Sequence, residues 1–166
     1  MKDRPIPEPT PPLTGPAFRQ AMSRFATGIT VVTAPGPDGP VGFTANSFSS
    51  VSLHPPLVQW SIALTSRRYD VFSAAPFFAI HVLSAQQLPL AMNFSQRGDG
   101  FEAFEWFGDA NGVPILPDSL ARFDCKHYTR HPAGDHSIIL GEVTGVATRA
   151  GECLVFSQGQ YGQFSS

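Results

Sequence analysis

The stretch Gly42–Pro56, GFTANSFSSVSLHPP, lies between two apolar runs, Gly28–Ala34 (GITVVTA) and Leu57–Leu64 (LVQWSIAL). Both runs are rich in β-branched and aromatic residues, which is typical of strands. The stretch between them mixes hydroxyl and amide side chains with apolar ones. Such a mixture places hydrogen-bonding groups beside apolar walls, as a flat ligand with polar edges requires. A Ser/Thr-rich strand with a loop is the alternative interpretation.

The letters TANSF and SVSLHPPLV resemble the flavin-binding segment of the short-chain flavin reductases, the FMN-binding split-barrel family. A second match lies at Gly134-Asp135-His136, followed by SIILGEV. The two motifs agree with the family in order and spacing, and the resemblance extends from about Phe18 to Phe164. It implies a mainly β fold, an antiparallel split β-barrel of the Greek-key type with a few flanking helices. Many members are reductase partners of two-component flavin-dependent monooxygenases.

Length and composition exclude several classes of protein. A chain of 166 residues is one domain with a substantial core. A net charge of -2 argues against nucleic-acid binding. With 14% charged residues the surface is poor in charge, which together with the resemblance predicts a homodimer. No apolar run matches a membrane span and the N-terminus lacks a hydrophobic leader, so we expect a cytoplasmic protein that does not enter membranes.

The proline-rich segment 1–15 predicts a disordered or extended tail, and residues 16–166 the folded domain. A proline-rich recognition site is the alternative for the tail. After Pro16, apolar residues at helical spacing predict an amphipathic helix capped by Thr14 or Gly15. Its expected apolar face comprises Ala17, Phe18, Ala21, Met22 and Phe25.

The remaining pattern predicts short strands joined by turns, with two further helices. The turn at Pro35–Pro40 closes a hairpin with Val41–Ser47. The expected helices are Tyr69–Ala75 and Ala85–Gln96, the latter interrupted by Pro89. The expected later strands are Phe77–Leu83, Phe123–Arg130, His136–Thr148, Leu154–Ser157 and Gln160–Phe164.

In the last third of the chain, alternation places Phe123, Cys125, His127 and Thr129 on one face, and Pro132 is expected to end that run. Gly141 and Gly145 mark expected bulges, where a sheet curls into a barrel. Cys125 and Cys153 are expected to be buried free thiols, and His81 a core or interface histidine.

The segment Ser66-Arg67-Arg68 precedes a short helix and predicts a clamp for a phosphate group, because arginine offers forked donors. A solvated basic turn is the alternative. In the resembling family the region after this strand contacts the flavin phosphate.

The resemblance therefore implies an NAD(P)H-dependent flavin reductase that uses FMN or FAD, with NADH or NADPH as co-substrate. His136 is expected to contact the nicotinamide as the catalytic residue, oriented by Asp135. The expected cofactor-binding residues are Thr44, Ala45, Asn46, Ser47, Ser61, Ser66, Arg67, Arg68, Asn93, Phe94, Ser95, Asp135, His136 and Tyr161. The alternatives are a flavin-binding electron carrier without a nicotinamide site and an inactive barrel kept for dimer formation.

Other chemistries fit the sequence less well. His127, His131 and His136 suggest a metal site, but no set of Asp, Glu or Cys residues completes a first shell, so we expect no metal. No serine lies in a glycine-flanked nucleophile elbow, which disfavours a hydrolase. The aromatic residues of the loop Gly98–Gly112 predict a satellite core or a movable lid.

Overall fold

The computed structural model describes residues 8–9 and 12–164. Its helices are α1 (Gly15–Met22), α2 (Tyr69–Ala74) and α3 (Leu88–Gln96), with short 3-10 turns η1 (Ala85–Gln87) and η2 (Phe101–Ala103). The strands in chain order are β1 (Thr27–Gly28), β2 (Thr30–Gly36), β3 (Gly39–Ala45), β4 (Ser49–Leu53), β5 (Pro56–Ala63), β6 (Phe77–Val82), β7 (Phe107–Gly108), β8 (Pro114–Ile115), β9 (Ala121–Ala133), β10 (His136–Thr148), β11 (Leu154–Ser157) and β12 (Gln160–Gln163).

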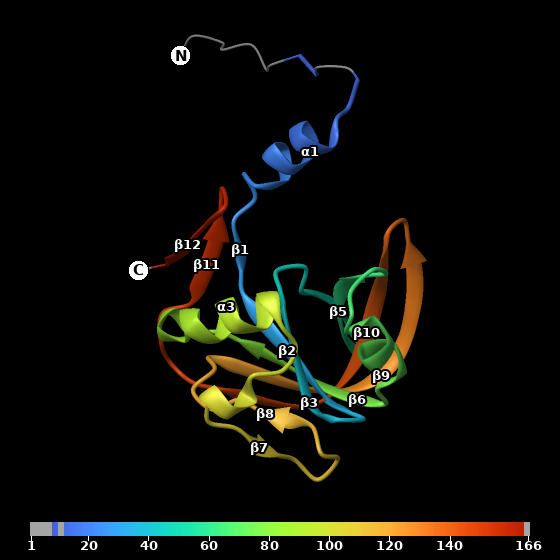
Figure 1. The fold of residues 1–166 in the computed structure, drawn as a ribbon, viewed down its shortest axis with the longest axis vertical. Coiled ribbons are helices and arrows are strands. Elements are labelled where there is room, and N and C mark those ends of the chain that lie inside the picture. Colours follow the sequence, from blue (N-terminus) through green and yellow to red (C-terminus); the bar gives the residue numbers. More distant parts are fainter. Residues whose placement is uncertain (1–7, 10–11, 165–166) are drawn as a thin grey trace.

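The main sheet has seven antiparallel strands in the order β3-β2-β6-β9-β10-β5-β4. β3 and β4 are therefore at opposite edges, although only Asn46–Phe48 separates them in the chain. The sheet curls so that the short connector bridges these two edges, which are not paired with each other (Figure 1). The backbone N–H of Ser61 on β5 donates to Ser47 Oγ at 2.9 Å across the gap. This curled but unclosed sheet is the split barrel, as the sequence predicted.

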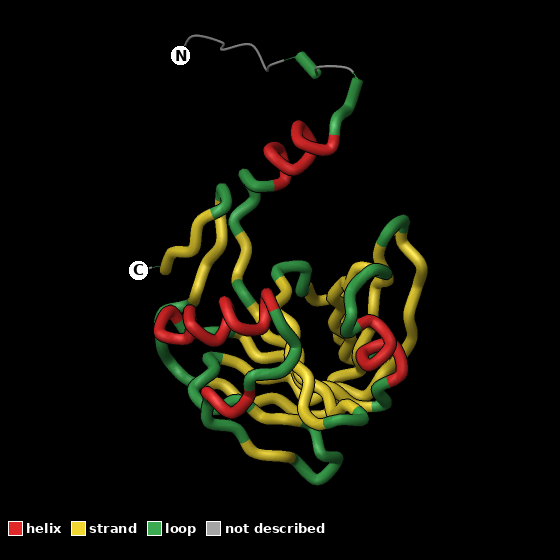
Figure 2. The backbone as a smooth tube through the Cα atoms, in the orientation of Figure 1, coloured by secondary structure: helices red, strands yellow, loops and turns green. Residues whose placement is uncertain are grey.

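A smaller sheet of β1, β11 and β12 extends from one edge of the barrel. Figure 2 shows this sheet and the β9–β10 hairpin as two separate projections on the same side of the molecule. β1 leads almost directly into β2, so the small sheet is an extension of the barrel wall. Phe156 on β11 and Tyr161 on β12 pack with their ring centroids 5.0 Å apart.

Two large hydrophobic clusters and a small third one, Ala79, Val113 and Ile115, form the core. The first fills the curled sheet beneath α2 and centres on Trp60, Phe72 and Phe78, whose rings pack edge to face. The second lies under α3 and contains Leu83 and Phe94. Burial of large aromatic side chains is a major stabilising contribution in a domain of this size. β2 and β3 lie between these two large clusters, and β3 leads into the predicted flavin segment.

α1 differs from the sequence expectation. Thr14 caps it as predicted, accepting a hydrogen bond from the Ala17 N–H at 3.3 Å. Its apolar residues, however, have no core to face: Phe18 is 54% exposed and Met22 55%. Figure 1 shows α1 standing clear of both sheets. The helix is also shorter than expected, because it ends at Met22 and leaves Phe25 beyond it, and none of its residues is buried.

β9 also differs from its prediction. It continues through Pro132 to Ala133, and Pro132 pairs with Ser137 beside the hairpin turn. The expectation that Pro132 ends the strand is therefore wrong. A register shift follows: His127 pairs with Gly141, whereas Thr129 pairs with Leu140. Since Leu140 and Gly141 are consecutive, His127 and Thr129 point to opposite faces, not to one face as predicted. The bulge that causes this lies beside Gly141, and a second shift lies beside Gly145, as the sequence predicted.

Smaller differences have local causes. Pro89 occupies the first turn of α3, where its missing N–H costs nothing, so it helps to start that helix and does not interrupt it. Ser49–Leu53 is a strand, β4, in a segment whose composition suggested a ligand-binding loop as well as a strand. Cys125 is buried as predicted, but Cys153 is half-buried; both are free thiols.

The expected tail, residues 1–15, falls largely outside the described residues. Within residues 8–9 and 12–164, no helix is both long and apolar enough to cross a membrane.

Candidate functional site

The connector Asn46–Phe48, together with Thr44 and Ala45 at the end of β3, is held from three sides. Thr44 Oγ1 donates to the Ala91 carbonyl of α3 at 2.7 Å. The Ala45 carbonyl accepts a hydrogen bond from Thr30 Oγ1 on β2 at 2.8 Å. Ser47 Oγ joins β5, as described above. The predicted flavin segment is therefore a crossing between the two edges of the barrel, with the Asn46 side chain left exposed.

A cavity of about 180 Å³ opens beside this segment. Four of its six lining residues were predicted to bind cofactor, and they come from β3, the connector, α3 and β12: Thr44, Asn46, Ser95 and Tyr161. Ile29 and Phe156 complete the wall. The sequence offered no signal for these two, because each lies in an ordinary apolar strand pattern. Small-molecule pockets usually enclose roughly 300–1,000 Å³, so this cavity holds only part of a flavin-sized ligand.

The second predicted motif lies on the β5 side of the connector, and no residue of β5 or β10 lines the cavity. Ser61 pairs with Ile138, and Ala63 pairs with His136, so these four side chains share one face of the ladder. Two residues along a strand are about 7 Å apart. His136 therefore lies about 7 Å along the ladder from Ser61, the residue to which Ser47 is bonded. The two motifs are almost ninety residues apart in the sequence and adjacent in the sheet.

The tip of the β9–β10 hairpin is open. His136 Nδ1 lies 2.7 Å from Asp135 Oδ1, and the two side chains are 45% and 94% exposed. The hydrogen bond from His136, followed by its charge, lowers the pKa of the Asp135 carboxyl. Gly134 has a φ of +66°, which permits the sharp turn before this pair. The Asp135 carbonyl accepts the Leu64 N–H at 2.9 Å, which ties the tip to the end of β5.

Arg67 and Arg68 differ sharply from one another. Arg67 is exposed, whereas Arg68 is half-buried. Arg68 Nη1 donates to the Phe94 carbonyl at 2.6 Å and to the Gly42 and Arg97 carbonyls at 3.2 Å each. Burial, and then the charge of Arg67, lower the pKa of the Arg68 guanidinium. Ser66 Oγ accepts the Arg68 N–H at 3.3 Å, so Ser66 shapes this turn.

The three predicted residues of α3 have separate surroundings. Phe94 is buried in the second core cluster, with its ring centroid 4.7 Å from that of Phe101. Its ring faces the core and does not line the cavity. The Asn93 amide donates to the Asp99 carbonyl at 3.1 Å and braces the following loop. Ser95 is exposed and lines the cavity, although its hydroxyl donates to the Met92 carbonyl at 2.8 Å.

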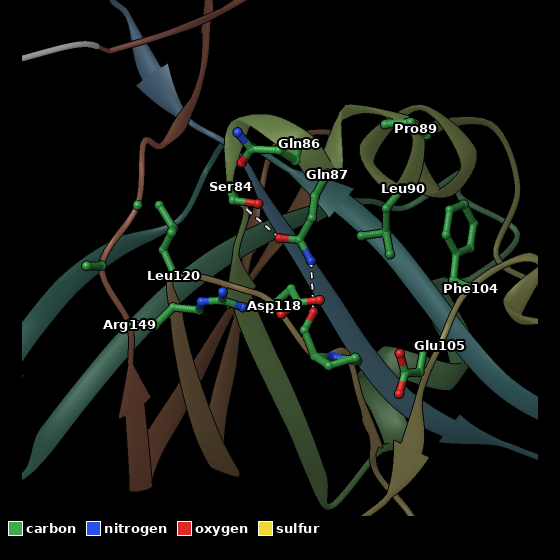
Figure 3. A pocket seen from close by; sticks show the side chains of 13 residues that line it. Ser84, Gln86, Gln87, Pro89, Leu90, Phe104, Glu105, Asp118, Leu120 and Arg149 are labelled. Atoms are coloured by element: carbon green, nitrogen blue, oxygen red, sulfur yellow. Dashed lines mark hydrogen bonds and ion pairs between the residues drawn. The ribbon is translucent and has the colours of Figure 1, made fainter.

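A larger cavity, of about 620 Å³, lies at the other end of α3 (Figure 3). Gln87 braces it, accepting the Ser84 N–H and donating to the Pro117 carbonyl, both at 3.0 Å. Arg149 and Asp118 form an ion pair at its edge. None of the predicted cofactor-binding residues lines this cavity, and we assign it no role.

The remaining histidines do not assemble a metal centre. In the part of the chain that the structure describes, no three His, Cys, Asp or Glu side chains gather in a metal-binding arrangement. His81 is a buried core histidine, as predicted: Nδ1 bonds the Val31 carbonyl and Nε2 accepts the Leu116 N–H, both at 3.2 Å.

Comparison with known proteins agrees with this geometry. Residues 22–165 match the model of the flavin reductase like domain. The FMN reductase (NADH) SmoA of Agrobacterium fabrum is 52% identical over 149 residues, covering 90% of this chain and 86% of the relative. The reductase subunit HsaB of a flavin-dependent monooxygenase from Rhodococcus jostii is 36% identical, covering 87% and 75%.

A solved structure is similar over nearly the whole chain. It is the Streptomyces globisporus NADH:FAD oxidoreductase SgcE6 in complex with NAD and FAD fragments, with a TM-score of 0.87 and 35% identity, covering 96% of this chain and 98% of that one. The domain match and the high coverage leave one assignment. This chain belongs to the flavin reductase like family.

Proposed function

We propose that this protein is an NAD(P)H-dependent flavin reductase that passes a hydride from nicotinamide C4 to N5 of FMN or FAD. The observation that carries the proposal is the position of β5 between the two motifs: its Ser61 backbone bonds Ser47 of the connector on one side, and its Ala63 pairs with His136 on the other. A flavin at the connector and a nicotinamide at the tip would then be neighbours. The named activities of the relatives, which use NADH with FMN or FAD, support the same pairing.

The two cofactors supply the hydride chemistry themselves, so the protein must bind, orient and shield them. In this proposal the fixed backbone of Thr44–Ser47 and the exposed amide of Asn46 hold the polar edge of the flavin, where negative charge grows during reduction. Tyr161 and Ser95 border the cavity that takes part of the ring. Asp135 accepts the His136 Nδ1–H and so directs Nε2 toward the nicotinamide.

Arg67 is our candidate for the flavin phosphate, because it is exposed while Arg68 is engaged with carbonyl groups. Arg67→Ala should weaken FMN binding, since a hydrogen bond to a charged group contributes about 1.5–3 kcal/mol. Riboflavin, which lacks the phosphate, should be affected little. Equal weakening of both ligands would place the phosphate elsewhere.

An electron carrier without a nicotinamide site is the competing function, because the open cavity accounts for flavin binding alone. The two are separated by following NADH oxidation with purified protein and added FMN. A reductase consumes NADH in proportion to enzyme and reduces the flavin. A protein that binds FMN but leaves NADH untouched, and NADPH likewise, is a carrier, and the reductase proposal fails.

We also propose that two copies form a homodimer. The cavity beside the connector is smaller than a flavin, and the apolar residues of α1 are exposed, so a second subunit would cover both. An isolated helix of eight residues is marginal in water, which favours a partner for α1. Sedimentation should show a dimer at micromolar concentration, and a monomer would contradict this part of the proposal.

The physiological partner in this proposal is a flavin-dependent monooxygenase in the cytoplasm. The relative HsaB is named as the reductase subunit of such an enzyme, which supports the assignment. The test is a coupled assay in which this protein and NADH replace chemically reduced flavin in supporting an oxygenase. Failure to support oxygenation while free flavin is reduced would limit the function to flavin reduction.

A further inference from the structure

Arg68 contacts three separate segments through one end of its side chain. Nη1 reaches the Gly42 carbonyl on β3, the Phe94 carbonyl within α3 and the Arg97 carbonyl just beyond it. Gly42 is two residues before Thr44, and Phe94 is one residue before Ser95. The carbonyls that Arg68 binds therefore flank two residues that line the candidate flavin cavity from different elements.

The contact with α3 satisfies a need of that helix. α3 ends at Gln96, and the last carbonyls of a helix lack partners within it. A cation at this end also complements the helix dipole. Arg68 supplies both, and it does so from the turn after β5, which is remote from α3 in the sequence. Arg68 thus ties the end of α3 to the barrel, in addition to the bond from Thr44 Oγ1 to the Ala91 carbonyl further back in the helix.

The space around Arg68 permits little adjustment. The Gly42 N–H donates to the Gly98 carbonyl at 2.8 Å, which brings β3 against the loop after α3. A Cβ atom at Gly98 would lie 2.7 Å from Arg68 Cδ, and one at Gly42 would lie 2.5 Å from the Phe94 ring. Two glycines therefore leave room for the guanidinium and for the close approach of the segments that it joins.

The Phe43 ring completes the surroundings, with the guanidinium carbon 4.9 Å from its centroid. A planar guanidinium can stack on a ring while donating in its own plane. An ammonium group is a compact point charge and cannot reproduce both contacts. The shape of the Arg68 side chain, and not its charge alone, matches this position.

We propose that Arg68 is a positioning residue for the flavin: it sets the distance between the connector side and the α3 side of the cavity without touching the ligand. The proposal rests on the flavin-binding site proposed above. It differs from a phosphate contact, because a positioning residue affects every ligand that shares the isoalloxazine ring. It differs from a purely structural role, because flavin affinity changes at temperatures where the protein is fully folded.

The test measures the affinity of Arg68→Ala for FMN and for riboflavin by quenching of flavin fluorescence, well below the melting temperature. We expect both ligands to bind about tenfold more weakly or worse, the equivalent of at least about 1.4 kcal/mol. Arg68→Lys, which keeps the charge, should recover only part of the loss. Added ethylguanidinium should recover more of the Arg68→Ala affinity than added ethylammonium does.

Arg67→Ala is the matched control, since it removes the neighbouring arginine and should affect FMN alone. An Arg68→Ala effect confined to FMN would overturn the proposal in favour of a phosphate contact. A lower melting temperature with unchanged affinity for both flavins would show a structural role only. If Arg68→Ala does not fold, Arg68→Lys decides by the same two affinities. Because binding is measured without NADH, these outcomes are independent of whether the protein turns over nicotinamide.

Discussion

The connector Asn46–Phe48 and the hairpin tip Gly134–His136 belong to the two predicted motifs, and they are built in opposite ways. Hydrogen bonds to β2, α3 and β5 fix the connector and the end of β3 before it. At the tip, His136 is paired in the sheet with Ala63 and Ala133, but the side-chain contact between His136 and Asp135 is exposed, and Asp135 is tied down only by the Leu64 N–H that its carbonyl accepts. The flavin side of the proposed site is thus formed in advance, whereas the nicotinamide side can adjust.

This difference suits two ligands with different tasks. A site formed in advance loses little conformational freedom when it binds, which favours affinity and orientation. An exposed side chain on a hairpin tip can let a dinucleotide arrive and leave without disturbing the core. The comparison predicts that changes near the connector alter stability and flavin binding together, while changes at the tip alter catalysis alone.

The largest expected effect concerns acid stability and tests the connector side. His81 lies on the same row of the sheet as Thr44, through Val31. Burial lowers its pKa to about 4, so below pH 6.5 the unfolded chain binds a proton that the folded chain excludes. The contribution of His81 to the free energy of unfolding should be fully present above pH 6.5. It should fall by about 3 kcal/mol as the pH reaches 4. Urea unfolding at several pH values measures this loss.

His81→Gln should flatten that pH dependence, whereas His136→Ala at the tip should leave it unchanged. An unchanged slope in His81→Gln would assign the acid sensitivity to other groups.

A pair of glycine substitutions compares the two regions directly. A Cβ at Gly42 would lie 2.5 Å from the ring of buried Phe94, so Gly42→Ala should cost about 1–3 kcal/mol and weaken flavin binding. A Cβ at Gly134 would have no heavy atom within 4 Å, but the φ of this residue is +66°. Gly134→Ala should therefore cost about 1 kcal/mol through backbone strain, without affecting flavin. Thermal unfolding and flavin titration would check both; equal effects on flavin would remove the distinction.

At the tip, His136→Ala should raise the KM for NAD(P)H or lower kcat by about ten- to a hundredfold, through the loss of about 1.4–2.7 kcal/mol of positioning. Flavin affinity and the melting temperature should barely change, because the side chain is about half exposed. Steady-state kinetics with each nucleotide provide the measurement. A variant that loses flavin or stability but oxidises nicotinamide normally would make His136 structural.

The smallest effect tests the bond across the split. Ser47→Ala removes the acceptor for the Ser61 N–H and should cost about 1 kcal/mol, with a modest loss of flavin affinity. Ser50→Ala on neighbouring β4, where the side chain is exposed, should be silent. If both variants unfold at the wild-type temperature, the connector is held without this bond.

Much of the fold could be predicted from local pattern. The β-branched runs, the hairpin glycines and the capping threonine each express a short-range preference, and the structure confirms the strands, the bulges beside Gly141 and Gly145, and the Thr14 cap. The resemblance of the two motifs to a family was equally local. The pairing of Asp135 with His136 needed only that they be neighbours in sequence.

Other features depended on contacts between distant segments, which short-range preferences do not encode. The bulge beside Gly141 turns Thr129 and His131 away from the face of His127, and no alternation pattern shows it. The apolar face of α1 was correct as a pattern, yet where that face packs depends on what lies opposite. Phe94 and Ser95 are adjacent, and only the packing of α3 sends one into the core and the other to the cavity.

Sequence alone determined the strands, the two motifs and the family, because these follow from residue type and spacing. Tertiary structure decided that Ser47 meets Ser61, that His136 lies along the same ladder, and that Arg68 binds carbonyls while Arg67 stays exposed. The physical reason is that register and burial are set jointly by seven strands and two core clusters. Two identical neighbouring residues can therefore acquire different roles.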